Sequence, residues 1–218
     1  NNNMEFAEHA LNLKAGMTIV SMLPMAHMYG MAFEFLYELT IGMHISFLTR
    51  IPSPKIIFQA LNEIKPSVIV AVPLIIEKIY RSQILAKFTS NAFWRALYNT
   101  AFTRRYLHRI AGKKLTKVFG GRARLFIGGA KLDEQVEQFL QEAKIPYAIG
   151  YGLTETAPLV AGQISPAVKL GATGPAMKGV EVRLDNINPD TKQGEIVVNS
   201  PSVMQGYYKN PEATADVF

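Results

Sequence analysis

Short apolar runs alternate with longer helical patterns over the first 150 residues, and this alternation restricts the fold more than any other feature. The runs are rich in β-branched and aromatic residues and lie at 18–23, 43–49, 67–72, 124–128 and 146–150. Apolar residues at helical spacing occupy the segments at about 29–40, 53–64, 73–86, 91–110 and 132–143. Strands that alternate with helices favour right-handed crossovers. We therefore predict an α/β fold, with a mainly parallel sheet covered by helices on both faces.

The pattern changes towards the end of the chain. Residues 180–184 and 195–198 are short segments of alternating polarity. Turn-forming residues separate them, among them Asn186, Pro189 and Gly194. This pattern is typical of antiparallel β structure.

Composition excludes several classes of protein. The 218 residues are 49% hydrophobic and 18% charged, which is enough apolar material for a substantial core. No run approaches the roughly 18 apolar residues of a membrane span, and residues 1–5 lack the basic and apolar regions of a signal peptide. The chain contains no cysteine, which excludes disulfides and thiolate metal sites. We expect a cytoplasmic protein.

A glycine-rich segment follows the fifth apolar run, at residues 150–156 with the sequence GYGLTET. Glycines allow the backbone to approach a ligand closely, and Tyr151 offers a face for stacking. The hydroxyl of Thr154 can donate to a phosphate, and Glu155 can bind a hard cation through oxygen. This ordered set of residues predicts a nucleotide site.

Other distinctive residues also follow predicted strands. His27 comes after the first strand, Pro73 after the third, residues 128–130 after the fourth and residues 151–155 after the fifth. Ligands of open α/β sheets bind beyond the carboxyl ends of the strands. We expect these segments to meet at one edge of the sheet.

Four motifs in order resemble the adenylate-forming enzymes, the superfamily of acyl-CoA synthetases, luciferases and peptide-synthetase adenylation domains. The motifs are LPMAHMYG at 23–30, GGA at 128–130, YGLTET at 151–156, and GEIVV at 194–198 with VMQGYY at 203–208 and PEAT at 211–214. The resemblance implies that residues 1–172 form an α/β subdomain of a larger N-terminal adenylation domain. It also implies that residues 173–218 begin a small antiparallel β-barrel subdomain.

The resemblance further implies roles for individual residues. Thr154 and Glu155 would be catalytic, with Glu155 binding Mg²⁺ and Thr154 bonding the α-phosphate of ATP. His27 and Gly128 would bind the acyl substrate, although a histidine at a strand end is also compatible with a structural role. The nucleotide would be bound by Gly129, Ala130, Gly150, Tyr151, Gly152 and Thr154.

A basic segment separates the third and fourth predicted strands. From Lys78 to Arg124 there are twelve lysines or arginines and no acidic residue. Two interpretations stay open: the aromatic residues pack on the protein with the arginines in solvent, or the segment contacts an anionic membrane surface. No nucleic-acid-binding motif accompanies the charge. At 100° per residue, one side of the predicted 91–110 helix carries Trp94, Tyr98, Phe102 and Tyr106, with Arg95, Arg105 and Arg109 among them.

The extended helical segment before the GGA motif resembles long-chain acyl-CoA synthetases. This resemblance implies an ATP-dependent fatty acid–CoA ligase, which forms acyl-AMP and pyrophosphate and then acyl-CoA and AMP. ATP, Mg²⁺, CoA and a fatty acid would be its ligands. The alternatives are a ligase of aryl or amino acids that loads CoA or a carrier protein, and a non-catalytic membrane-binding domain.

Three features of such enzymes do not occur in this sequence: the phosphate loop ending in Lys-Gly, the ribose-binding Asp of a TGD motif and the C-terminal catalytic lysine. We therefore expect the 218 residues to be an internal fragment that is inactive by itself. Acyl chain length and oligomeric state have no signal in the sequence.

Overall fold

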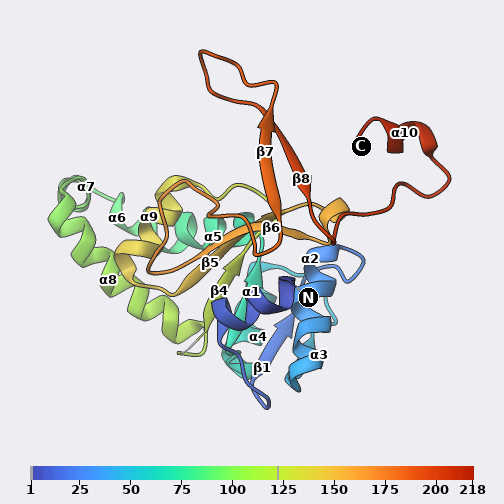
Figure 1. The fold of residues 1–218 in the computed structure, drawn as a ribbon. Helices are drawn as coiled ribbons and strands as arrows, with labels where there is room; N and C mark the ends of the chain where they lie inside the picture. The colour runs from blue at the N-terminus through green and yellow to red at the C-terminus, as the bar shows by residue number, and fades with distance from the viewer. Residues whose placement is uncertain (1, 122) are drawn as a thin grey trace.

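A six-stranded sheet forms the centre of the computed structural model, which describes residues 2–121 and 123–218 (Figure 1). The strand order is β2-β1-β3-β4-β5-β6. The first five strands of the chain pair in parallel, whereas β6 is antiparallel to β5. The strands are β1 (Thr18–Ser21), β2 (His44–Phe47), β3 (Val68–Ala71), β4 (Arg124–Ile127), β5 (Tyr147–Gly152) and β6 (Leu159–Ile164).

All five predicted strands are confirmed, and so is the mainly parallel sheet. The sequence analysis missed β6. Its first five residues are buried, so the strand has no alternation of apolar and polar residues. Gly162 further weakens its resemblance to a strand.

Helices cover both faces of the sheet, as predicted (Figure 1). Alternate residues of each strand point to opposite faces. One face packs against α4 (Pro54–Ile64), α5 (Pro73–Ile79), α8 (Ala101–Val118) and α9 (Glu134–Ala143). The other face packs against α1 (Asn2–Leu11), α2 (Met28–Met31), the π-helix η1 (Ala32–Leu36) and α3 (Tyr37–Ile41).

Side-chain caps determine where two of these helices begin. The Ser53 hydroxyl accepts a hydrogen bond from the N–H of Ile56 at 3.4 Å, and Pro54 stands in the first turn of α4. Asp133 caps α9 by accepting from the N–H groups of Gln135 and Val136 at 2.9 and 3.2 Å. Both starts could be read from the sequence because capping depends on adjacent residues.

The predicted continuous helix over 91–110 is wrong. Thr100 has extended dihedral angles, φ −89° and ψ 120°, and separates α7 (Ala92–Asn99) from α8. The ring of Phe88 lies 6.0 Å from that of Trp94 and 5.8 Å from that of Tyr98. Because of the break, these aromatic residues pack inwards while others on α8 face solvent. The predicted 73–86 helix is confirmed: residues 73–88 are continuously helical, with the π-helix η2 (Tyr80–Leu85) between α5 and α6 (Ala86–Phe88).

The last part of the chain is an antiparallel hairpin and an arm. The hairpin, β7 (Glu181–Asp185) and β8 (Glu195–Asn199), projects from the body of the molecule (Figure 1). The arm that follows contains α10 (Pro211–Ala215). The antiparallel prediction is thus confirmed, whereas the β-barrel and the boundary between 172 and 173 stay predictions. Within the described residues, no helix has the length and apolar character needed to cross a membrane.

Candidate functional site

The predicted site residues meet at the carboxyl ends of β1, β4 and β5, where they line two adjoining cavities. The smaller cavity, of about 250 Å³, is lined in part by His27, Gly128, Thr154 and Glu155. The larger, of about 950 Å³, is lined in part by Ala130 and Tyr151. Both cavities share Gly129, Gly150, Gly152 and Leu153. The convergence expected from the strand order is therefore observed for His27, the 128–130 turn and the 151–155 loop, whereas Pro73 lines neither cavity. The roles of the residues stay predictions.

A tight turn forms the loop after β5. The β5–β6 pairing shifts register between Tyr151 and Gly152, and the 3₁₀ helix η3 (Thr154–Thr156) follows. The Thr156 hydroxyl lies 2.7 Å from the carbonyl oxygen of Pro158, to which it donates. A Cβ atom at Gly152 would lie only 1.6 Å from that same oxygen. The loop therefore requires glycine at 152.

Glu155 presents its carboxylate at the smaller cavity. Tyr207 Oη donates to Glu155 Oε1 at 2.7 Å, and the N–H of Met204 donates to the Glu155 carbonyl at 2.8 Å. The hydrogen bond from Tyr207 lowers the pKa of Glu155, so the carboxylate is ionised at neutral pH. The sequence analysis missed Tyr207 because it lies 52 residues away in the chain.

The donor set at Glu155 fits Mg²⁺ bound together with a phosphate ligand. The described residues contain no group of three or more His, Cys, Asp or Glu that could hold a metal. Mg²⁺ is commonly bound by one or two carboxylates plus substrate phosphates and water. A lone ionised carboxylate beside the hydroxyl of Thr154 matches that mode of binding, and a closed protein cage does not.

His27 has a defined structural partner in addition to its place in the cavity. Its Nδ1 accepts from the N–H of Tyr29 at 3.1 Å and caps α2. Tyr29 is buried and donates from Oη to the carbonyl of Phe126 at 2.8 Å. A Cβ at Gly128 would lie 3.2 Å from Cζ of Tyr29. The space beside Gly128 is thus limited by the tyrosine ring.

Two neighbouring elements hold the site loops in place. The Glu77 carboxylate on α5 accepts from the N–H of Asp133 at 3.2 Å, just beyond the turn after β4. On the other side, Asn3 of α1 donates to the carbonyl of Ala157 and accepts from the N–H of Leu159 at 3.2 Å. The sequence analysis missed Asn3 because no local signal connects residues 154 positions apart.

Comparisons with known proteins agree with this geometry. A profile of the family described as AMP-binding enzyme matches residues 1–208. The chain is 28% identical over 225 residues to long chain acyl-CoA synthetase 5 of Arabidopsis thaliana, with 91% of this chain and 33% of that protein covered. This chain therefore spans about a third of the length of that relative.

Solved structures share the fold. The N-terminal domain of FACL13 from Mycobacterium tuberculosis has a TM-score of 0.70 at 17% identity, covering 99% of this chain and 48% of that one. A benzoate CoA ligase from Burkholderia xenovorans LB400 has a TM-score of 0.70 at 20% identity, covering 98% and 40%. Residues of the motifs line the two adjoining cavities, and the family profile covers nearly the whole chain. This protein belongs to the family of AMP-binding enzymes.

Proposed function

We propose that this chain carries the nucleotide-binding core of an ATP-dependent fatty acid–CoA ligase. In the first step the fatty carboxylate attacks the α-phosphorus of ATP, which forms acyl-AMP and releases pyrophosphate. In the second step the thiol of CoA displaces AMP and forms the thioester. The proposal is supported by the position of the predicted residues at two adjoining cavities, which are lined by Tyr151, Thr154, Glu155, the 128–130 turn and His27.

The residues of the cleft contribute position and charge. Glu155 is ionised and serves as a cation ligand, and a bound Mg²⁺ supplies neutralisation of the phosphate charge. Thr154 donates a hydrogen bond to the α-phosphate. Tyr151, together with the 129–130 turn, would lie against the adenine. The fixed loop reduces the entropic cost of bringing the two reactants together.

A fatty acid is the proposed substrate because this chain is 28% identical, over 91% of its length, to long chain acyl-CoA synthetase 5 of Arabidopsis thaliana. An aryl acid is the second candidate, since the benzoate CoA ligase shares the fold over 98% of this chain.

ATP–pyrophosphate exchange by the full-length protein tests both substrates. A panel of aliphatic carboxylic acids of increasing length is compared with benzoate and with amino acids, and Glu155→Ala is the control. Exchange that increases with chain length and disappears in Glu155→Ala supports the fatty acid ligase. Exchange with benzoate alone would show that the substrate is an aryl acid and not a fatty acid. If no acid supports exchange, the proposed adenylation is rejected.

We also propose that α8 makes a peripheral contact with an anionic membrane. Phe102 and Tyr106 are 83% and 65% exposed, and Arg105 and Arg109 are exposed beside them. Arg104 is different, because its side chain is only 23% exposed and lies 3.1 Å from Glu142, whereas Arg105 is 68% exposed and approaches the same carboxylate only to 3.9 Å. Arg105→Glu with Arg109→Glu should reduce sedimentation with anionic vesicles. The matched control, Lys14→Glu with Lys192→Glu, makes the same charge change elsewhere, and equal sedimentation of the two double variants would reject this contact.

A further inference from the structure

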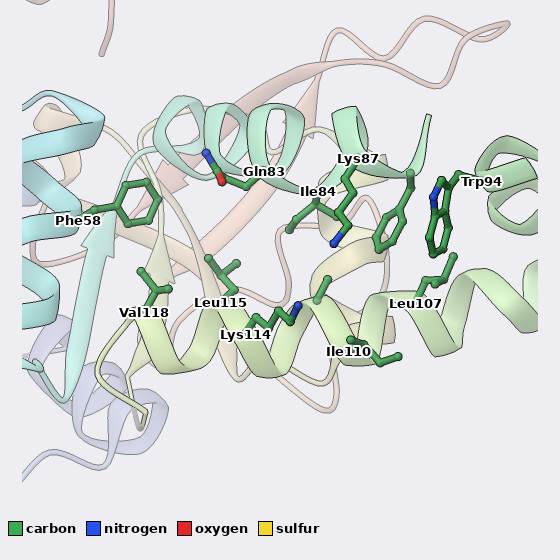
Figure 2. A pocket seen from close by; sticks show the side chains of 12 residues that line it. Phe58, Gln83, Ile84, Lys87, Trp94, Leu107, Ile110, Lys114, Leu115 and Val118 are labelled. Atoms are coloured by element: carbon green, nitrogen blue, oxygen red, sulfur yellow. The ribbon is translucent and has the colours of Figure 1, made fainter. Parts of the chain in front are cut away.

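A separate cavity of about 480 Å³ lies between α4, the η2–α6 segment and α8 (Figure 2). None of the residues that line it lines either cavity of the candidate site. Its volume falls within the range of about 300–1,000 Å³ that is usual for small-molecule sites. We call this cavity the helical groove.

The floor of the helical groove is apolar and recessed. Ile84, Leu107 and Leu115 form part of it, and their exposed fractions are 4%, 9% and 8%. Ile110 and Val118 stand at the margin, with 40% and 38% of their surface exposed. A flat membrane surface can reach only the margin, whereas a single aliphatic chain can enter between the helices and cover the floor.

Two lysines face each other across this floor. Lys87 on α6 and Lys114 on α8 both point into the gap between their helices (Figure 2). Within the described part of the chain, neither ammonium group forms an ion pair with a carboxylate. The elements that carry them contain no acidic residue, since the sequence from 78 to 124 has none. The groove therefore combines an apolar floor with two positive charges that have no acidic partner.

We propose that the helical groove binds a single-chain amphipathic anion, namely a monomeric fatty carboxylate. The aliphatic chain covers Ile84, Leu107 and Leu115, and the carboxylate lies between Lys87 and Lys114. Charge complementarity supports an anionic head, and the recessed floor supports one flexible chain over a second protein surface. This proposal does not rest on the adenylation reaction, because the groove shares no residue with the candidate active site.

Trp94 provides a reporter inside the groove. It lines the cavity and is the only tryptophan among the 218 residues. The 218-residue chain would be titrated with dodecanoate brominated on its aliphatic chain, below the concentration at which dodecanoate forms micelles. Bromine quenches an indole only at close contact, so quenching of Trp94 distinguishes this groove from the acyl pocket of the candidate active site. We expect saturable quenching that unlabelled dodecanoate reverses.

Two charge-reversal variants provide the decisive comparison. Lys87→Glu with Lys114→Glu should weaken the binding at least tenfold, whereas Lys113→Glu with Lys117→Glu makes the same change in charge outside the groove and should retain it. Circular dichroism of each variant verifies folding, which these exposed positions should not disturb. Glu155→Ala should retain the quenching, so that failure of adenylation and failure of this proposal can be told apart.

Several outcomes overturn the proposal. These are no quenching in the wild-type chain, equal loss in both double variants, or equal quenching by a brominated dodecyl trimethylammonium cation. A change in Trp94 emission that occurs only with anionic vesicles would assign the surface to a membrane. A change that follows protein concentration and coincides with dimerisation would assign it to a second copy of the chain.

Discussion

Tyr207 and Glu155 lie 52 residues apart and are joined by a hydrogen bond of 2.7 Å from the phenol Oη to the carboxylate Oε1. The C-terminal arm thereby reaches the proposed cation ligand, and the N–H of Met204 secures the same residue through its carbonyl. A cation at Glu155 must share this oxygen with Tyr207 or displace it. The arm is therefore placed to influence the metal dependence of the site.

Tyr207→Phe removes the phenol that competes for Glu155. The pKa of Glu155 should rise towards its ordinary value, which still leaves the carboxylate ionised at pH 7. We expect half-saturation by Mg²⁺ to occur at a roughly threefold lower concentration, a modest effect because an exposed hydrogen bond contributes little. Mg²⁺ titrations of nucleotide binding measure this. Tyr208→Phe is the matched control, and a higher Mg²⁺ requirement in Tyr207→Phe would contradict the competition.

Gly152→Ala should disrupt the loop after β5. The new Cβ would lie 1.6 Å from the Pro158 oxygen, so the backbone must move. We expect a loss of about 2–4 kcal/mol in the free energy of unfolding, together with the loss of nucleotide binding. Gly16→Ala is the control: its φ is +80° but its Cβ would meet nothing within 4 Å, so it should cost only about 1 kcal/mol. Equal losses in urea unfolding would show that the contact with Pro158 is unimportant.

The buried His108 should make a contribution that lowers the free energy of unfolding in mild acid. It is 1% exposed, and its Nδ1 lies 2.7 Å from Oε2 of Glu142. Burial lowers the pKa of His108 despite this carboxylate, so the imidazole is neutral in the folded state at pH 7. As pH falls below about 6.5, the unfolded chain gains a proton at His108 that the folded chain does not, so the contribution of His108 to the free energy of unfolding decreases. Comparing urea unfolding of the wild type with that of His108→Gln between pH 7.5 and 5 isolates this contribution from that of the buried carboxyls Glu34 and Glu38.

Glu142 extends the same acid sensitivity to lower pH. Burial opposes its ionisation, but the hydrogen bond from Arg104 and the proximity of His108 lower its pKa overall. Its stabilisation is present above the ordinary carboxyl pKa and is lost as pH falls through the lowered value. His108→Gln should remove this contribution, so the free energy of unfolding of the wild type should fall relative to that of the variant between pH 6.5 and 5, while the loss below about pH 4 persists in both. A difference between the two proteins that stays constant above pH 5 would rule out a role for His108.

Glu38 should destabilise the fold at neutral pH. It is 0% exposed, and among the described residues neither carboxylate oxygen has a hydrogen-bond partner. Burial raises its pKa to about 8. Keeping the proton at pH 7 costs about 3 kcal/mol relative to the unfolded chain, an order-of-magnitude figure. Glu38→Leu should therefore increase the free energy of unfolding, with a gain that grows from pH 5 to pH 8.

Glu34 is the matched contrast to Glu38, one helical turn away. It is also 0% exposed, and burial raises its pKa to about 7. Its Oε2, however, accepts from the N–H groups of Met22 and Leu23 at 2.9 and 2.8 Å. At pH 5, where keeping the proton of Glu34 costs little, Glu34→Leu should reduce the free energy of unfolding by about 2–4 kcal/mol, because the N–H groups of Met22 and Leu23 lose their acceptor. In urea unfolding at pH 5, Glu38→Leu should still increase the free energy of unfolding, so opposite signs are expected for the two substitutions.

Local chemistry made much of the fold readable from the sequence. Strands β1 to β5 lie in apolar runs rich in β-branched and aromatic residues, and Ser53 caps α4 through a neighbour only three residues away. The GYGLTET loop could be recognised because its glycines and polar side chains follow one another directly. The meeting of the motifs at one edge follows from parallel strand order, since the carboxyl ends of parallel strands lie on the same side.

Distant contacts were decided only by the tertiary structure. The helix breaks at Thr100, and Trp94 and Tyr98 pack on Phe88. Helical spacing alone does not show where such a break occurs. In β6, burial removes the alternation by which a strand is recognised. The bonds from Asn3 and Tyr207 to the site loop join residues 154 and 52 positions apart. Periodicity and capping depend on residues a few positions apart in the sequence. Hydrogen bonds such as those of Asn3 and Tyr207 form only when the whole chain has packed and brought distant segments together.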